Sequence, residues 1–491
     1  MLHPMNEPGP LQAVREELSA LMAELEATAV DASSRRVPDE RRAALLNLKH
    51  YLCVRRHDLR PLQLHLSMLG LSSLNHLEPH VASGLSAVLQ VARALLGEVT
   101  WTAPTEQPRI DDCYRLIEPH AEKLLGPHRS DRHVRIMVTM SAAQAADARG
   151  LGALMAAGMD VARINCAHDS PAEWRKLATT LRQVAQQQER SLRIAMDLGG
   201  PKLRTGAYWM PPDTRRLFRG DRLRLVRSTA AATACDASLA VASCSLPEAL
   251  DSVRVGHRVL LKDGKLVGHV TSTDAEGIEL EVTRVAEKGF KLKSDRGIHF
   301  PDSDLALTAL TDADLACLPD VVKLADVVNL SFCQSGDDVR ALREALRDLG
   351  RPDLGVVAKI ETRQGFEALP GILEALMEGP AAGVMIARGD LAVEVGYERI
   401  SEVQEEILWL CEAAHMPVIW ATQVLESLAQ DGIPSRAEIT DAARGERAEC
   451  VMLNKGPYVR EAVQALDDIL RRMEGHHSKK GSVLRPLRAF G

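Results

Sequence analysis

The sequence predicts an α/β protein: a closed (β/α)8 barrel, a small β-barrel lid domain inserted in one barrel loop, and an all-α module in front of the barrel. Three observations support this prediction. Short Val- and Ile-rich runs alternate with amphipathic helical segments from residue 134 onward, and eight such runs can be counted. A long interval between the third and fourth runs contains strand-like pieces without helical periodicity. The first part of the chain is helical in pattern.

Leucines at helical spacing define the N-terminal module, which is predicted over residues 1–125. One series follows Pro10 and a second follows Pro38, and proline is favoured in the first turn of a helix. A third Leu-rich stretch, residues 59–96, is interrupted by glycine and proline. The pattern predicts a separate helical unit and indicates no function for it.

The barrel is predicted over residues 131–205 and 289–475, in two pieces on either side of the insertion. Parallel strands that are covered on both faces have continuous apolar runs. The eight expected strands are VRIMVT from residue 134, VARIN from 161, RIAMD from 193, VVNLSF from 327, LGVVAKIE from 354, GVMIARGD from 383, PVIWAT from 417 and ECVMLNK from 449. Each precedes a helical segment or the insertion, as in the repeating unit of such a barrel.

The inserted lid domain is predicted over residues 206–288. Its strand-like pieces, RLRLV, HRVLL, GHVTST and IELEVTRV, are separated by Gly and Asp, which favour tight turns. At the end of the chain, residues 476–491 are predicted to be a solvated basic tail.

Bulk composition argues against several classes of protein. With 46% apolar and 26% charged residues the chain has the composition of a folded protein, and its formal net charge of −7 argues against nucleic acid as a partner. We find no apolar stretch of the roughly 20 residues that a membrane span needs, and no signal-peptide pattern. We therefore expect a cytoplasmic protein with no membrane partner. Nine cysteines without a C-x-x-C pair argue against a disulfide framework and a thiolate zinc site.

Polar residues gather at the predicted carboxyl ends of the strands, where barrels of this kind place their chemistry. They are Arg163 and Asn165 at the second strand, Asp197 at the third, Lys359 and Glu361 at the fifth, Asp390 at the sixth and Thr422 at the seventh. Alternate residues of a strand point to the same side, so we expect Lys359 and Glu361 to face one pocket.

Two of these carboxylates, Glu361 and Asp390, suit Mg²⁺ or Mn²⁺, because such ions bind oxygen ligands and keep several waters. Four cations at the same rim suit a ligand with several negative charges; they are Arg163, Lys202, Arg204 and Lys359. The alternative is a set of ordinary salt bridges, in which Lys359 pairs with Glu361 or Asp390 and Arg204 pairs with Asp197.

Seven segments resemble the pyruvate kinase family. They are AGMDVARINCAHDSPAEW, MDLGGPKLRTG, LLKDGKLVGHV, VVAKIETRQGFEALPGIL, GVMIARGDLAVEV, PVIWATQVLESL and PSRAEITDAA. The resemblance spans roughly residues 131–473. It implies a Mg²⁺-dependent kinase that transfers the phosphoryl group of phosphoenolpyruvate to ADP and so forms pyruvate and ATP.

The resemblance also implies roles for the matching residues. Lys359 would stabilise the transferring phosphoryl group, and Arg163 would hold the phosphate. Glu361 and Asp390 would ligate the metal.

Substrate contacts follow from the same resemblance. Gly389, Asp390 and Thr422 would contact the three-carbon substrate, and Thr422 would act beside the water that protonates the enolate. Arg204 and Lys288 would contact the nucleotide. The lid domain would close over the barrel mouth and exclude water.

Departures from the family pattern concern the monovalent cation. Of the potassium site only Asn165 and Asp197 are retained, while Ala167 and Leu198 stand where potassium-dependent members have hydroxyls. Potassium-dependent members have glutamate at the position of Lys202. Members that work without potassium have lysine there, as this chain does. We therefore expect Lys202 to substitute for K⁺, so that K⁺ is not required.

We further expect the chain to be a variant without the C-terminal regulatory domain of the family and with an extra N-terminal helical module. Homo-oligomerisation is compatible with the sequence but not specified by it. Two other functions stay open: a Mg²⁺-dependent barrel lyase or aldolase that acts on a pyruvate enolate, and a non-catalytic regulatory protein that binds phosphorylated metabolites.

Overall fold

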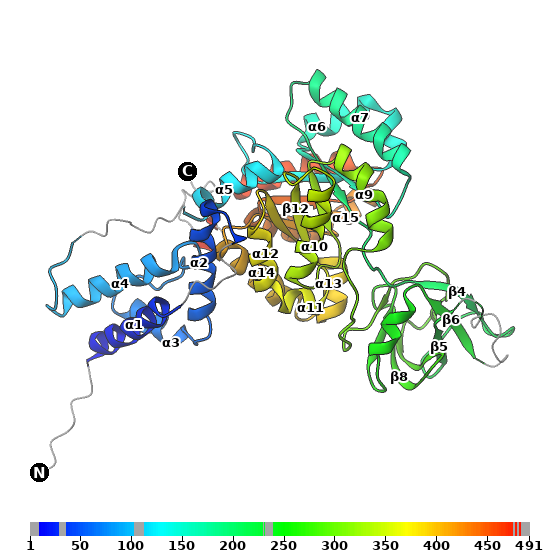
Figure 1. Cartoon of the computed structure of the whole chain (residues 1–491), viewed down its shortest axis with the longest axis horizontal. Helices are drawn as coiled ribbons and strands as arrows, with labels where there is room; N and C mark the ends of the chain where they lie inside the picture. Colours follow the sequence, from blue (N-terminus) through cyan, green and yellow to red (C-terminus); the bar gives the residue numbers. More distant parts are fainter. Residues whose placement is uncertain are drawn as a thin grey trace, which may run out of the picture.

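The computed structural model describes residues 9–28, 36–102, 112–228, 230, 239–474, 477–478 and 481–482. A strand barrel lies between a group of N-terminal helices and a small β domain (Figure 1). The predicted fold class is confirmed.

Eight parallel strands close the barrel in the order β1-β15-β14-β13-β12-β11-β3-β2. They are β1 (Arg135–Thr139), β2 (Val161–Asn165), β3 (Arg193–Asp197), β11 (Val327–Leu330), β12 (Gly355–Ile360), β13 (Ala382–Ala387), β14 (Val418–Ala421) and β15 (Cys450–Leu453). Each lies where the sequence predicted a strand. The register places Asn165 beside Asp197 at the carboxyl ends of β2 and β3.

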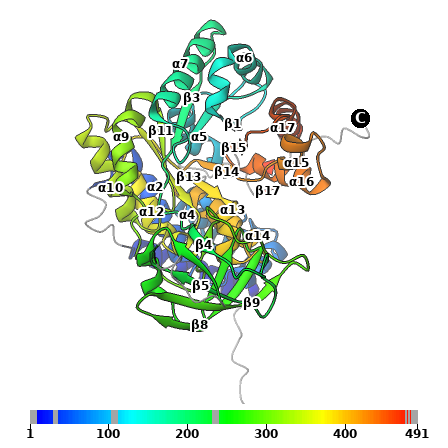
Figure 2. The ribbon, with the colours of Figure 1, turned by 90° about the vertical axis from the view of Figure 1, so that its right-hand side faces the viewer.

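Helices cover the outside of the barrel (Figure 2). They are α6 (Ala148–Ala157), α7 (Pro171–Gln187), α9 (Asp312–Leu324), α10 (Gly336–Asp348), α11 (Arg363–Glu367), α12 (Leu369–Met377), α13 (Arg388–Val395), α14 (Ile400–Ala413), α15 (Glu426–Asp431), α16 (Arg436–Arg444) and α17 (Val459–Met473), with the 3-10 turns η3 (Ala142–Ala146) and η5 (Gly445–Arg447). Four of them start at a capping box, in which a Ser or Thr and an acid three residues later satisfy each other's backbone N–H groups. The Ser or Thr residues are Ser170, Thr311, Ser335 and Ser435.

The inserted domain is a seven-stranded sheet with the order β10-β7-β8-β9-β5-β6-β4, which encloses its own apolar core. The elements are β4 (Thr205–Trp209), β5 (Arg222–Val226), β6 (Ala240–Cys244), the 3-10 turn η4 (Pro247–Ser252), β7 (Arg258–Leu261), β8 (Leu266–Asp274), β9 (Gly277–Val285) and β10 (Ile298–His299). Strand β10 belongs to this sheet although it lies beyond residue 288, the predicted end of the inserted domain. Two residues are too few for a strand pattern to be recognised.

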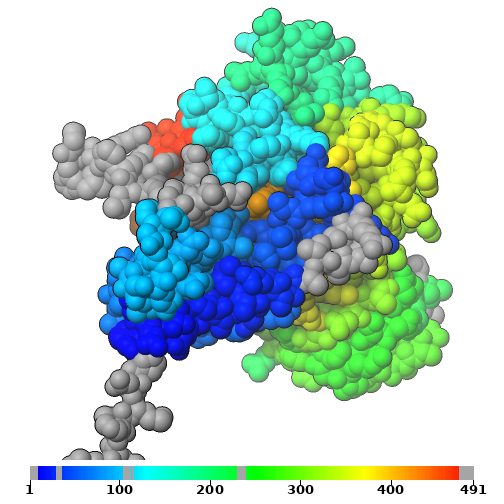
Figure 3. Space-filling model, turned by 60° about the vertical axis from the view of Figure 1, so that its left-hand side comes forward, coloured from blue at the N-terminus to red at the C-terminus, as the bar shows by residue number. Residues whose placement is uncertain are grey.

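Within its described residues, 9–28, 36–102 and 112–125, the N-terminal part of the chain forms five helices and the 3-10 turn η2. They are α1 (Pro10–Glu26), α2 (Asp39–Val54), α3 (Arg60–Met68), η2 (Glu78–His80), α4 (Val81–Leu95) and α5 (Asp112–Leu125). Buried residues of α1, α2, α3 and α4 belong to the same apolar cluster as those of the barrel helices, and Figure 3 shows this part of the chain lying against the rest of the molecule. Helix α2 contacts α12 and α14.

Helix α5 closes the N-terminal end of the barrel. Leu124 and Leu125 belong to one buried cluster with inward-facing strand residues such as Met137. A Cβ atom at Gly355 would lie 2.7 Å from Leu124 Cδ1, and one at Gly383 would lie 2.6 Å from Leu124 Cδ2. Glycine near the starts of β12 and β13 therefore makes room for the leucine.

One half-buried amide, that of Asn47, joins the N-terminal helices to the barrel. The Nδ2 of Asn47 donates to the carbonyl oxygens of Glu78, at 2.7 Å, and of Ala413, at 2.9 Å. Its Oδ1 accepts from the backbone N–H of Val81 at 2.8 Å. The side chain thus connects α2 with the start of α4 and with the end of α14.

A search of the described residues finds no helix whose length and apolar content would allow it to cross a membrane. The predicted tail, residues 476–491, lies outside the described residues, apart from two short strands, β16 (His477–Ser478) and β17 (Gly481–Ser482).

We expect Asn47→Ala to lower the free energy of unfolding by about 1–3 kcal/mol, because it leaves two carbonyls and one N–H without their partner. Urea unfolding followed by circular dichroism measures the change. Arg42→Ala, at an exposed position of the same helix, is the control and should change the stability by less than about 0.5 kcal/mol. Equal losses in the two variants would contradict the role of Asn47.

Candidate active site

A buried network of charges lies at the carboxyl ends of β2, β3 and β12, and its centre is Asp197. One oxygen of this carboxylate, Oδ2, accepts from Arg163 Nη2 at 2.7 Å and lies 3.1 Å from Lys359 Nζ. The other, Oδ1, accepts from Asn329 Nδ2 at 2.6 Å. Asp197 is 1% exposed, so the two cations share a carboxylate from which water is excluded.

Lys359 is held by three groups. Its ammonium donates to Ser331 Oγ at 2.8 Å and lies 3.3 Å from Glu361 Oε1, in addition to its contact with Asp197. Lys359 and Glu361 do lie on the same side of their strand, as their alternation in the sequence predicted, and their charged ends are in contact. Ser331 Oγ in turn donates to the carbonyl oxygen of Leu198 at 2.7 Å, which fixes the hydroxyl that receives the ammonium.

The charges of this network shift the pKa values in the directions expected for ion pairs. Burial raises the pKa of the Asp197 carboxyl, but Arg163 and Lys359 outweigh burial and hold it well below its usual range. Burial lowers the pKa of Lys359, yet Glu361 and Asp197 raise it above its ordinary value. Both groups are therefore charged at neutral pH.

Glu361 and Asp390 form the pair of carboxylates predicted from the sequence. Burial and the negative charge of Asp390 raise the pKa of Glu361, although Lys359 lowers it. Burial and the second carboxylate both disfavour the ionised form of Glu361, and a bound cation would offset both effects. The Oε2 of Glu361 is oriented by the backbone N–H of Phe332, at 2.7 Å.

The donor set fits Mg²⁺ or Mn²⁺, which take carboxylate oxygens together with water and substrate oxygens. Within the part of the chain that the structure describes, no group of three or more His, Cys, Asp or Glu residues is arranged to hold a metal ion. The protein would therefore supply two ligands, Glu361 and Asp390. Lys202 Nζ donates to both oxygens of Asp390 at 2.9 Å. Burial raises the pKa of Asp390, but Lys202, together with His299 and Lys359, outweighs burial and holds it below its usual value.

Lys202 is carried by a tight loop that follows β3. The carboxylate of Asp314, in the first turn of α9, accepts from the backbone N–H groups of Gly199, at 2.7 Å, and Gly200, at 3.2 Å. Gly200 has φ of 65°, and a Cβ there would lie 2.9 Å from the Cβ of Ser331. Only glycine fits this left-handed position against the serine that holds Lys359.

Thr422 occupies a strained turn after β14, with φ of 66°, followed by Gln423 with φ of 58°. Non-glycine residues in this region cost free energy and are common at functional sites. Thr422 Oγ1 accepts from the backbone N–H of Gly389 at 2.7 Å. The guanidinium of Arg388 donates to the carbonyl oxygens of Ala421 and Thr422 and pairs with Asp441, so it holds the turn against α13.

The two residues expected at the nucleotide lie apart from this network. Arg204 Nη1 pairs with Asp295 Oδ1 at 2.8 Å and not with Asp197, which was the salt bridge considered for it. Lys288 lies in a groove of the inserted domain with other cations; they are Arg216, Lys262, Lys265, Arg284, Lys291, Lys293 and Arg296. Repulsion from Lys265 and Arg296 lowers the pKa of Lys262, as expected for crowded positive charges.

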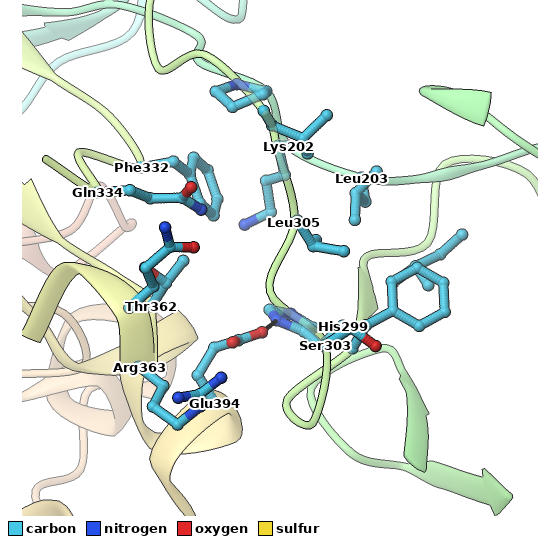
Figure 4. Close-up of a pocket in the computed structure, with 15 residues that line it drawn as sticks. Lys202, Leu203, His299, Ser303, Leu305, Phe332, Gln334, Thr362, Arg363 and Glu394 are labelled. Atoms are coloured by element: carbon cyan, nitrogen blue, oxygen red, sulfur yellow. Dashed lines mark hydrogen bonds and ion pairs between the residues drawn. The ribbon is translucent and has the colours of Figure 1, made fainter. Parts of the chain in front are cut away.

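Several residues of the site were not predicted from the sequence. Asn329 and Arg388 act through partners that are distant in the sequence, although a polar residue inside the buried run VVNL was a usable signal for Asn329. His299 and Glu394 were also missed. Their Nδ1 and Oε1 atoms lie 3.0 Å apart in a pocket between the inserted domain and the barrel, whose lining includes Lys202 and Phe332 (Figure 4).

Fold and site together define a class: a (β/α)8 barrel whose carboxyl end carries buried cations and paired carboxylates beneath an inserted β domain. The sequence profile of the family described as "Pyruvate kinase, barrel domain" matches residues 131–463. The chain belongs to the pyruvate kinase family.

Curated relatives named pyruvate kinase agree with this assignment. The chain is 32% identical over 328 residues to the protein from Thermotoga maritima, which covers 65% of this chain and 66% of the relative. It is 33% identical over 328 residues to the protein from Geobacillus stearothermophilus, covering 65% and 54%. It is 32% identical over 356 residues to the protein from Leishmania mexicana, covering 70% and 67%. The chain thus spans between about half and two-thirds of the length of these relatives.

We expect Asp197→Asn to lower the free energy of unfolding at pH 7, because the variant leaves two buried cations without their carboxylate. The folded-state pKa of Asp197 is depressed, so its stabilising effect is complete above the unfolded value of about 3.9 and is lost as the pH falls towards the folded value. The difference in unfolding free energy between the wild type and the variant should therefore be constant from pH 7 to about pH 5 and should become smaller below about pH 4.

Urea unfolding at a series of pH values measures this difference. Asp468→Asn removes an exposed acid that pairs with Arg472 and should have little effect at any pH. A difference as large at pH 3 as at pH 7 would show that the charge of Asp197 is not the cause.

Proposed function

We propose that the protein is an active pyruvate kinase, which transfers the phosphoryl group of phosphoenolpyruvate to ADP. The observation that supports this most is the position of Lys359, whose ammonium lies between Asp197 and the Glu361–Asp390 pair. Phosphoryl transfer needs chiefly positioning and cations at the oxygens of the transferring group. Membership of the family supports the substrates, and the cytoplasmic location expected from the sequence belongs to the same proposal.

The charged residues of the site would have separate roles in the transfer. The ammonium of Lys359 would stabilise the phosphoryl oxygens during transfer, and the guanidinium of Arg163, fixed by Thr139 at 2.9 Å and by Asp197, would hold the phosphate. A divalent cation held by Glu361 and Asp390 would neutralise further negative charge on the substrates. Because Asp197 and Thr139 orient the cations before substrate binds, little reorganisation remains for the reaction itself.

Thr422 would serve the proton transfer to the enolate. Its Oγ1 already accepts from the Gly389 N–H, so the hydroxyl hydrogen is free to donate to substrate or to a water beside it. The inserted domain would cover the barrel mouth and exclude water. Its basic groove, with Lys288, and Arg204 beside it would receive the anionic nucleotide.

Independence from K⁺ is part of the proposal. Both oxygens of Asp197 are engaged by Arg163, Lys359 and Asn329. Asn165 Oδ1 accepts from the backbone N–H of Ala167 at 3.0 Å. These contacts and the ammonium of Lys202 at Asp390 support a site that carries its own positive charge.

We expect the purified protein to form pyruvate from phosphoenolpyruvate and ADP with Mg²⁺, which a coupled lactate dehydrogenase assay measures. Lys359→Ala should lower kcat by at least about a thousandfold, because it removes a charge that acts on the transition state. Arg347→Ala, on the outer helix α10, is the control. A wild-type rate of zero, or an unchanged rate in Lys359→Ala, would refute the function and would favour the lyase or the metabolite-binding alternative.

We also expect K⁺ to change the rate by less than about tenfold, because Lys202 provides a fixed positive charge at the metal carboxylate. The test compares the rate in Tris, Na⁺ and K⁺ at equal ionic strength. An increase of more than tenfold that is specific to K⁺ would contradict this expectation.

A further inference from the structure

The inserted domain rests directly on α13, the helix that carries Asp390 in its first turn. Leu260 and Val267 of the inserted domain form a buried cluster with Val393 of α13. Beyond the end of α13, the hydroxyl of Tyr397 donates to the carbonyl oxygen of Asp263 at 3.0 Å. The contact surface is therefore partly apolar and partly hydrogen-bonded.

His299 is the polar centre of this contact. It lies in β10, which pairs with β7 at the edge of the inserted sheet, and it is 4% exposed. Its Nδ1 lies 3.0 Å from Glu394 Oε1, and because an ionised carboxylate can only accept, Nδ1 carries the hydrogen and donates it. Its Nε2 lies 3.5 Å from Asp390 Oδ1. Figure 4 shows the ring next to the Glu394 carboxylate, with a dashed line that marks this contact.

The spacing of the two carboxylates explains how one ring reaches both. Asp390 lies in the first turn of α13 and Glu394 four residues later, and residues four apart lie on the same face of a helix. The face that binds His299 is thus the face that presents Asp390. A shift of the inserted domain along this face would move the ring relative to both carboxylates.

We propose that His299 is a positioning residue that couples docking of the inserted domain to the placement of Asp390. The hydrogen bond to Glu394 seats the domain on α13, and the ring then limits the positions open to the Asp390 carboxylate. For its effect on catalysis the inference rests on the proposed function, because Asp390 is there a metal ligand and a substrate contact.

The experiment uses the full chain with four substitutions. His299→Ala removes the contact, whereas His299→Asn keeps an N–H donor at nearly the position of Nδ1. Glu394→Gln removes the charge of the acceptor. His257→Ala is the matched control, since His257 is a histidine of the same domain whose Nδ1 contacts Ser303 at 2.8 Å instead of the barrel.

Two readouts do not require turnover. Hydrogen exchange of residues 258–261 and 388–395, without substrates, reports docking of the inserted domain. Binding of Mn²⁺ alone, followed by electron paramagnetic resonance, reports how well the carboxylates of Glu361 and Asp390 are placed to hold a metal ion. We expect His299→Ala to speed exchange at both segments and to raise the Kd for Mn²⁺ by about threefold to tenfold, the loss of one buried hydrogen bond. His299→Asn should restore most of both properties. The effect of His299→Ala should be smaller in the Glu394→Gln background, where the amide oxygen still accepts a hydrogen bond but carries no charge.

Three outcomes would overturn the inference: exchange and Mn²⁺ binding unchanged in His299→Ala, an equal effect of His257→Ala, or a His299→Asn variant as impaired as His299→Ala. If the two readouts respond as expected but the wild-type protein forms no pyruvate, the proposed function fails while the role of His299 stands. In an active enzyme, His299→Ala should lower kcat more than it changes the KM for phosphoenolpyruvate.

Discussion

The arrangement of the site depends on one buried carboxylate that serves two cations. Asp197 binds both Arg163 and Lys359, and burial of either cation without it would cost more free energy than the fold could easily tolerate. Because the three residues come from β2, β3 and β12, their ion pairs hold the carboxyl ends of strands that are far apart in the sequence. The same contacts keep Lys359 charged and oriented, so stability and chemistry depend on the same carboxylate.

The regular elements could be predicted because their signals are local. Buried parallel strands have continuous apolar runs, and helix starts such as Ser170 and Ser435 have their acid three residues later. The candidate site residues could be grouped for a related reason: a barrel brings the ends of all its strands to one rim, so Arg163, Glu361 and Thr422 were expected near one another without knowledge of any distance.

What could not be predicted is the choice of partners. Lys359 meets Glu361, one of the two acids considered for it, and also Asp197, which was not considered. Arg204 meets Asp295 instead of Asp197, because the sequence does not say which of several acids a cation will contact. His299 was missed because its strand has only two residues and its acceptor, Glu394, lies 95 positions away. The docking of Leu124 under Gly355 and Gly383 was missed as well, since a glycine that makes room for a distant leucine resembles any other glycine in a strand.

The leucines at the end of α5 have a consequence for how the chain is built. Leu124 and Leu125 belong to the interior of the barrel, yet they precede its first strand in the sequence. During synthesis this apolar pair emerges before any strand that will surround it, so the barrel can assemble around a seed that is already present. The helical part of the chain thus supplies two residues of the barrel interior, at the end opposite to the polar network of Asp197.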